Sequence, residues 1–295
     1  MTTSVPQFFV STKIQSLKQV STAVTTLLVM GAALFITTPM LAEEKFVIGS
    51  MGDSITRAFD ATRPLDNPKL SWSTGDDIFS RVASHLVRIR EMHGIKVLGY
   101  NVARSGGKAV EMPGQAKKLA RHKPNYVTML IGANDLCGWS ENADADIELL
   151  EKNVRKGIDV LIDSNPNVLI AISPVPDMHN LWEIGSGNRC QKKWDLLKIC
   201  PRLLSSKSTT AARDIFKSQW ADVNQTYERI AADFPKNVRY AAEGANVKFE
   251  PKHISTLDCF HPSITGQNLL SEIVWDAVAP DMYLIEQTAV TGSQN

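Results

Sequence analysis

Short apolar runs alternate with longer amphipathic segments from about residue 43 onward. The runs are rich in β-branched residues and have the length of buried strands, whereas the segments between them repeat apolar residues at helical spacing. We expect strands at Lys45–Met51, Lys96–Val102, Tyr126–Ile131, Asn167–Ser173 and Val238–Ala242. This alternation predicts an α/β protein with one parallel sheet of about five strands, covered by helices.

Several of the intervening segments carry clear helix signals. In the first, apolar residues recur at helical spacing from Ile78 to Ile89, after a start signal at Ser73–Asp77. Further helices are expected over Pro113–His122, Asp144–Ser164, Thr209–Asp233 and Pro262–Val278. Pro262 suits the first turn of a helix, where its missing N–H is not needed.

The segment Pro174–Ser208 follows neither pattern and contains Trp182, Trp194 and a Gly-Ser-Gly stretch. A long structureless segment inside a compact domain is usually functional or disordered, and the tryptophans argue against disorder. We therefore expect a long loop insertion at about 174–208 that forms a lid or a wall of a substrate site. No internal repeat or low-complexity linker divides residues 43–295, which predicts a single domain.

Residues 1–42 differ from the rest of the chain. They contain two lysines, no acidic residue, an apolar stretch over about 20–37 and then the small residue Ala42. This is the pattern of a signal peptide. We expect cleavage after Ala42 and export of residues 43–295 to a periplasm or to the medium. The alternative is an uncleaved N-terminal membrane anchor, because the apolar stretch is close to the ~18 residues that a membrane span requires.

Composition and charge exclude some functions. The chain has 295 residues, of which 43% are hydrophobic and 21% charged, as in ordinary globular proteins. Its 32 basic and 31 acidic side chains form no long run of like charge, so we expect no nucleic-acid partner.

Four cysteines, an even number, fit an exported chain with disulfides. They are Cys137, Cys190, Cys200 and Cys259. Three pairings are possible, and Cys190 with Cys200 is the easiest local pair. Neither a C-x-x-C pair nor an H-E-x-x-H motif occurs, so we expect no metal and no cofactor.

Polar motifs follow the first three predicted strands and precede the last predicted helix. Gly52-Asp53-Ser54 follows the first strand, Gly106 the second and Asn134 the third, while Asp258 and His261 lie just before Pro262. The carboxyl ends of parallel strands form a ligand crevice. A serine there needs a base, and an aspartate three residues before a histidine can orient its ring. A backbone N–H at a glycine and the Asn134 amide could stabilise an oxyanion. Each motif alone also suits a cap or a turn, but together they indicate acyl transfer.

With these residues the chain resembles the SGNH (GDSL) hydrolase family of lipases and esterases. The matching blocks are GDS at 52–54, the glycine of NVARSGG, GAND at 132–135 and DCFH at 258–261. The sequence departs from the family pattern at GDSI, where GDSL is commonest, and at Gly106-Gly107, which leaves the oxyanion glycine open by one position. The GAND–LC and DCFH stretches most resemble the phospholipase B-like branch.

The resemblance implies a flavodoxin-like, three-layer α/β/α sandwich and hydrolysis of carboxylic esters in lipids, acylated sugars or thioesters. It implies Ser54 as nucleophile, His261 as base and Asp258 as the carboxylate of the triad. Ser54, Gly106 and Asn134 would form the oxyanion hole. The expected partner is a small-molecule or lipid ester, with contact to a membrane surface as a further possibility.

Two alternatives remain. Ser105 in ARSGG could be the nucleophile of a variant G-x-S-x-G elbow, as in an α/β-hydrolase-type esterase with the same downstream Asp and His. Alternatively, the chain could be a carbohydrate- or surface-binding module without turnover, because a fold does not determine a function.

Overall fold

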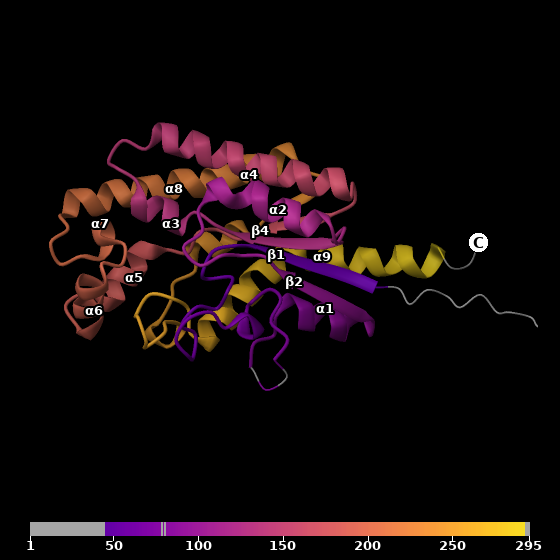
Figure 1. Ribbon diagram of the computed structural model, residues 1–295, viewed down its shortest axis with the longest axis horizontal. Helices are drawn as coiled ribbons and strands as arrows, with labels where there is room; N and C mark the ends of the chain where they lie inside the picture. The colour runs from indigo at the N-terminus through magenta and orange to yellow at the C-terminus, as the bar shows by residue number, and fades with distance from the viewer. Residues whose placement is uncertain (1–44, 78, 80, 293–295) are drawn as a thin grey trace, which may run out of the picture. The chain divides into compact units, whose positions relative to one another are not determined.

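Five parallel strands form one sheet in the order β2-β1-β3-β4-β5 (Figure 1). The computed structural model describes residues 45–292 except 78 and 80, with side chains to residue 283. The strands are β1 (Lys45–Gly52), β2 (Lys96–Asn101), β3 (Tyr126–Leu130), β4 (Leu169–Ile172) and β5 (Val238–Tyr240). This strand order is that of flavodoxin-like folds, which confirms the predicted fold class. The predicted signal peptide or anchor lies outside the described residues.

The register of β1 explains where a site can form. Gly52, the last residue of β1, pairs with Leu130, the last residue of β3. The chain therefore leaves both strands at the same edge of the sheet, which brings Asp53 beside Ile131. Strand order reverses at this place, because β2 lies on one side of β1 and the later strands lie on the other. Ligands of such sheets bind at this switch point.

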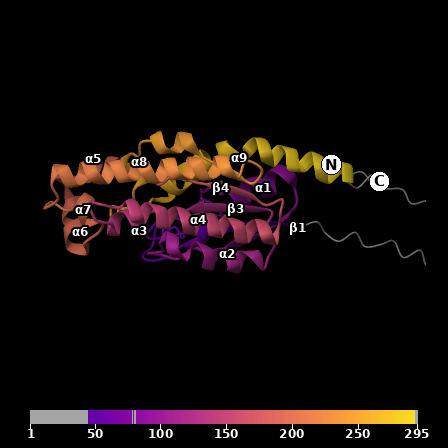
Figure 2. The same cartoon turned by 90° about the horizontal axis from the view of Figure 1, so that it is seen from above.

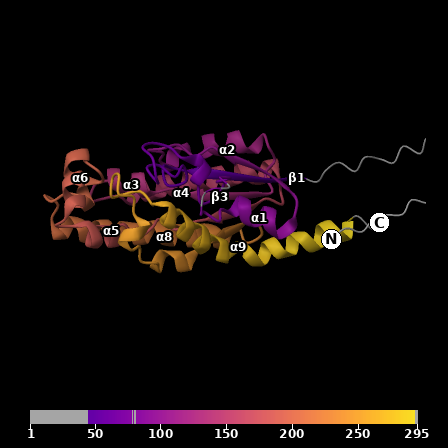
Figure 3. The same cartoon turned by 90° about the horizontal axis from the view of Figure 1, so that it is seen from below.

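Helices cover both faces of the sheet. One face packs against α2 (Met112–Ala120), α4 (Asp144–Ser164) and α8 (Thr210–Asp233), and the other against α1 (His85–His93) and α9 (Ile264–Gly292). Side chains of β3 alternate between two cores, as the pleat requires: Met129 belongs to the first and Leu130 to the second. Helices α4 and α8 run side by side in Figure 2, and α1 and α9 in Figure 3. The three-layer arrangement is therefore as predicted.

Helix α1 begins later than its apolar spacing predicts. Ser84 caps it: the Ser84 hydroxyl accepts the N–H of Val87 at 3.2 Å and donates to the carbonyl of Gly75 at 2.5 Å. The described residues before the cap form turns and coil instead, and Phe79, expected in the helix, is 90% exposed. Helix α9 starts two residues after Pro262 and continues through Pro280, beyond the predicted end.

The segment predicted to be irregular, 174–208, contains three helices. These are α5 (Met178–Gly185), α6 (Arg189–Leu197) and α7 (Pro201–Leu204). In Figure 1 they lie at the same end of the sheet as α3 (Ala133–Gly138), the helix that follows β3. Asp177 and Asn188 cap α5 and α6 through side-chain hydrogen bonds. Trp194 is buried, and its indole N–H donates to the carbonyl of Cys259 at 3.0 Å. The segment is thus packed against the domain.

Both disulfides join distant parts of the chain. They are Cys137–Cys200 and Cys190–Cys259. The expectation of disulfides is confirmed, but the local pair Cys190–Cys200 is wrong. Cys190 lies in the first turn of α6 and Cys200 just past its end, and a helical rise of about 10 Å from residue 190 to 197 sets the two toward opposite ends of that helix. Among the described residues, no helix has the length and apolar character of a membrane span.

Candidate active site

Three side chains that are distant in sequence form one hydrogen-bonded chain. Ser54 Oγ lies 2.8 Å from His261 Nε2, and His261 Nδ1 lies 2.5 Å from Asp258 Oδ2. Asp258 Oδ1 accepts the backbone N–H groups of Phe260 and His261 at 2.9 and 3.1 Å. Both oxygens of Asp258 are therefore occupied, and the imidazole is held between a carboxylate and a hydroxyl.

The end of β1 is held in place by Gln115 of α2. Its side chain accepts the N–H of Gly52 at 2.8 Å and donates to the Gly52 carbonyl at 2.9 Å. Gly52 has a φ of +143°, and a Cβ at this position would lie 2.2 Å from the carbonyl oxygen of Leu130. Only glycine fits such a close approach of two backbones. This geometry fixes the point from which the chain turns to present Ser54.

Asp258 and His261 lie on a short, well-bonded turn. The N–H of Ser255 donates to the carbonyl of His261 at 2.8 Å, and the N–H of Cys259 donates to the carbonyl of Ser255 at 3.0 Å. Burial alone would raise the pKa of Asp258, but the hydrogen bond and the charge of His261 outweigh it and hold that pKa below its ordinary value. Asp258 therefore stays ionised at neutral pH.

Backbone N–H groups and an amide side chain lie beside Ser54 in one cleft. Asn134, in the first turn of α3, donates one amide hydrogen to the carbonyl of Gly107 at 3.0 Å, which orients its side chain. The N–H of Gly107 is used by the carbonyl of Arg104 at 2.8 Å. Within the described part of the chain, the N–H groups of Gly106 and Ser54 have no acceptor. This favours Gly106 over Gly107 as the backbone donor.

A cleft of about 330 Å³ brings the predicted residues together. Ser54, Gly106, Asn134 and His261 all border it, and Asp258 lies behind His261. The structure therefore places all five sequence-predicted site residues at one location.

Sequence reasoning missed several residues that border the same cleft. Phe59 and Phe260 both contact His261, with ring centroids 4.9 and 5.0 Å from its ring. Lys198 and Ile199, between α6 and α7, also line it. Phe260 lies inside the DCFH block, so that motif carried a signal for it, whereas nothing in the pattern around Phe59 indicated a site residue.

Ser105, the alternative nucleophile, also borders the cleft. Its hydroxyl donates to Asp66 Oδ1 at 2.5 Å, an acceptor on an exposed loop. Among the described residues no histidine is hydrogen-bonded to Ser105, because the imidazole at this cleft is bonded to Ser54. The arrangement therefore supplies a base to Ser54.

Two further aspartates are buried beneath the cleft. Asp53 Oδ1 accepts the N–H of Ile55 at 2.9 Å, and Asp135 accepts the N–H of Ala109 at 3.1 Å. Burial raises the pKa of Asp53 to about 7 and that of Asp135 to about 6. Both carboxyls hold loop backbone in place. Within residues that the structure describes, no group of three or more His, Cys, Asp or Glu could hold a metal ion.

The sequence block that begins in β1 and ends in α9 matches a known family. A family model described as GDSL-like Lipase/Acylhydrolase matches residues 48–274. The chain belongs to this family. Membership assigns it to the carboxylic ester hydrolases, and the matched range contains every residue of the hydrogen-bonded chain described above.

Two individual proteins that resemble the chain are less than 30% identical to it. Membrane-associated phospholipase B1 of Mus musculus is 28% identical over 204 residues, which are 59% of this chain and 14% of that protein. The Rattus norvegicus protein is 26% identical, over 78% of this chain and 19% of its own length. The chain thus matches less than a fifth of the length of these relatives.

A solved structure shows the same fold. The extracellular lipase from Streptomyces rimosus superposes with a TM-score of 0.50 at 14% identity, covering 79% of this chain and 99% of the lipase. At this identity the likeness concerns the fold alone.

Proposed function

We propose that this chain is an exported serine ester hydrolase that acts through Ser54, His261 and Asp258. The observation that supports it most is the continuous chain of hydrogen bonds from Ser54 Oγ through the imidazole to Asp258, at 2.8 and 2.5 Å. A serine hydroxyl becomes a useful nucleophile when an oriented base can take its proton.

Acylation would begin when Ser54 Oγ attacks the carbonyl carbon of the ester while His261 Nε2 takes the hydroxyl proton. Asp258 holds the imidazole in the required tautomer and stabilises the imidazolium. The oxyanion would accept hydrogen bonds from the N–H groups of Ser54 and Gly106 and from the Asn134 amide. The C–O bond to the leaving alcohol then breaks, and the alcohol departs with the proton from His261.

Deacylation would repeat these steps with water. His261 takes a proton from the water as its oxygen attacks the acyl carbon, and the bond to Ser54 Oγ breaks. The proton returns to Ser54, and the carboxylic acid leaves. One ester and one water thus give one acid and one alcohol, and the chain's own residues supply each proton transfer.

The substrate class is proposed from the cleft and the relatives. Lipid esters are supported by the family description and by two relatives that are membrane-associated phospholipases B1. Acylated sugars and thioesters remain within the same chemistry. Two disulfides support an oxidising compartment, a periplasm or the medium, and contact with a membrane surface belongs to the same proposal.

Turnover of para-nitrophenyl acetate and butyrate by the purified protein tests the proposal, beside Ser54→Ala and Ser105→Ala. We expect wild-type turnover, loss to near background in Ser54→Ala and near wild-type rates in Ser105→Ala. Activity that survives in Ser54→Ala and vanishes in Ser105→Ala would instead support the elbow mechanism. A wild-type protein that turns over no ester would support the binding module.

A further inference from the structure

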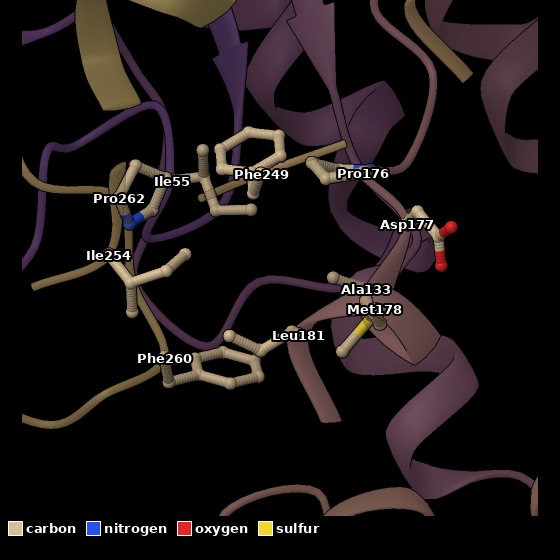
Figure 4. A pocket seen from close by; sticks show the side chains of 10 residues that line it. All are labelled: Ile55, Ala133, Pro176, Asp177, Met178, Leu181, Phe249, Ile254, Phe260 and Pro262. Atoms are coloured by element: carbon tan, nitrogen blue, oxygen red, sulfur yellow. The ribbon is translucent and has the colours of Figure 1, made fainter. Parts of the chain in front are cut away.

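A partly enclosed apolar chamber lies next to the catalytic cleft, and Figure 4 shows the side chains that line it. Its lining includes neighbours in sequence of the site residues: Ile55 follows Ser54, Ala133 precedes Asn134 and Pro262 follows His261. Met178 and Leu181 of α5 line it as well. The chamber therefore borders the segments that carry the reacting groups.

The chamber offers no charged group to an occupant. Asp177 is the charged residue in its lining, and Figure 4 shows its carboxylate turned away from the centre. That carboxylate accepts the N–H of Asn180 at 2.9 Å and pairs with Lys248. An occupant that contacts only carbon would fit such a wall, whereas an ion or a sugar hydroxyl would lose its hydrogen bonds to water.

Phe260 is the partition between chamber and cleft. It borders both cavities, and its ring stands edge-on to the ring of His261. Its backbone is held, because its N–H donates to Asp258 and the preceding Cys259 is bonded to Cys190. Opening the partition therefore requires rotation of the Phe260 side chain rather than movement of the chain.

The chamber is small and adjoins a larger cavity. Its volume is about 40 Å³, against about 330 Å³ for the cleft. Beyond Leu181 and Ile254, which line both cavities, lies an outer cavity of about 460 Å³ between α5, α6 and the segment 251–259. The chamber thus shares Phe260 with the cleft on one side and Leu181 and Ile254 with the outer cavity on the other.

We propose, on the basis of the serine ester hydrolase function above, that a long acyl chain of the substrate extends from the cleft into this chamber, and that the ring of Phe260, which stands between the two, limits how far the chain extends. The cleft itself carries Ser105 and Lys198 beside Ser54, and these polar side chains suit a polar alcohol. The apolar side therefore takes the acyl group. With the ring of Phe260 in its present place, the enzyme accepts short acyl chains. Without it, methylenes can extend into the chamber and, past Leu181 and Ile254, toward the outer cavity.

The test is the ratio of kcat/KM for para-nitrophenyl octanoate to that for the acetate. Burial of each added methylene strengthens binding by about fourfold, and octanoate has six methylenes more than acetate, so the ceiling for the ratio is on the order of 10³-fold. We expect Phe260→Ala to raise the octanoate-to-acetate ratio at least tenfold. The matched control is Phe59→Ala, which removes the other ring that contacts His261 but does not border the chamber. We expect Phe59→Ala to leave the ratio within about twofold.

A second variant closes the path from the far side. Leu181→Trp should lower octanoate turnover in the wild type more than acetate turnover, and it should cancel the gain of Phe260→Ala in the double variant. If Phe260→Ala hydrolyses acetate but its ratio stays at the wild-type value, the chamber does not hold the acyl chain, although the esterase function stands. If wild-type protein hydrolyses neither ester, the proposed function and this inference fall together.

Discussion

Replacement of Asp53 by Asn should change how stability depends on pH. The Asp53 side chain is fully buried, and Oδ2 has no hydrogen-bond partner among the described residues. Burial, the largest cause, raises the pKa of Asp53 from 3.8 to about 7. Asparagine keeps the acceptor for the N–H of Ile55 and remains neutral at every pH, so it imitates the protonated carboxyl.

The expected size follows from the pKa difference. The folded protein binds a proton at Asp53 between about pH 4 and 7 that the unfolded chain releases. The free energy of unfolding of the wild type therefore falls as pH rises through this window, by up to ~1.4 kcal/mol per pH unit. Over the whole window this amounts to about 4 kcal/mol, and above pH 7 the loss is complete. Asp135 titrates in the same direction in both proteins, so the difference between them reports Asp53 together with its charge interaction with Asp135.

Urea unfolding of both proteins from pH 4 to pH 8 measures this difference. We expect the free energy of unfolding of Asp53→Asn minus that of the wild type to be about 4 kcal/mol larger at pH 8 than at pH 4. Any offset that arises from the extra amide hydrogens is independent of pH and cancels in the comparison. Two parallel curves would refute the reasoning, because they would mean that Asp53 is ionised in the folded protein throughout this range.

Three further changes have defined outcomes. Asn134→Ala should lower kcat for para-nitrophenyl butyrate about 10²- to 10³-fold in steady-state kinetics, and an unchanged kcat would remove the amide from the oxyanion hole. Cys137→Ser should lower the free energy of unfolding by about 2–4 kcal/mol, because Cys137–Cys200 closes a sequence separation of 63 residues; equal midpoints in urea would contradict this. Burial lowers the pKa of His85 to about 3, so the folded protein loses stability as pH falls from 6.5 toward 3. In urea unfolding, the free energy of unfolding of His85→Gln should fall less between pH 6.5 and pH 3 than that of the wild type. An equal fall in both proteins would show that His85 does not cause it.

The sheet was predictable because its signal is local. Buried parallel strands are short β-branched runs, and each predicted run overlaps a strand of the structure. Helix α4 has the predicted bounds, since its apolar stripe and its acidic first turn agree. Helix α1 was predicted to start too early because apolar spacing continues through residues that Ser84 and loop hydrogen bonds hold in another conformation.

The segment 174–208 and the disulfides depend on tertiary contacts. The burial of Trp194 and the caps at Asp177 and Asn188 stabilise short helices that have little periodicity of their own. Disulfide pairing follows from which loops meet, and sequence proximity misled the choice of Cys190 with Cys200.

The predicted site residues came together because motifs at the ends of parallel strands must share one edge. Ser54 and Asn134 follow two paired strands, β1 and β3, and that pairing could be anticipated from the fold class alone. The apolar surroundings could not be anticipated, because Phe59 and Ile199 reach the cleft through turns that carry no regular pattern. Reacting groups were thus readable in the sequence, while the walls that select a substrate were not.

Location of a covalent adduct tests the central claim most directly. The purified protein would be treated with diethyl para-nitrophenyl phosphate, which phosphorylates an activated serine, and its peptides would be analysed by mass spectrometry. The account predicts one adduct on Ser54 and greatly slowed labelling in His261→Ala. An adduct on Ser105 in the wild type, or a folded protein that shows no adduct, would contradict it.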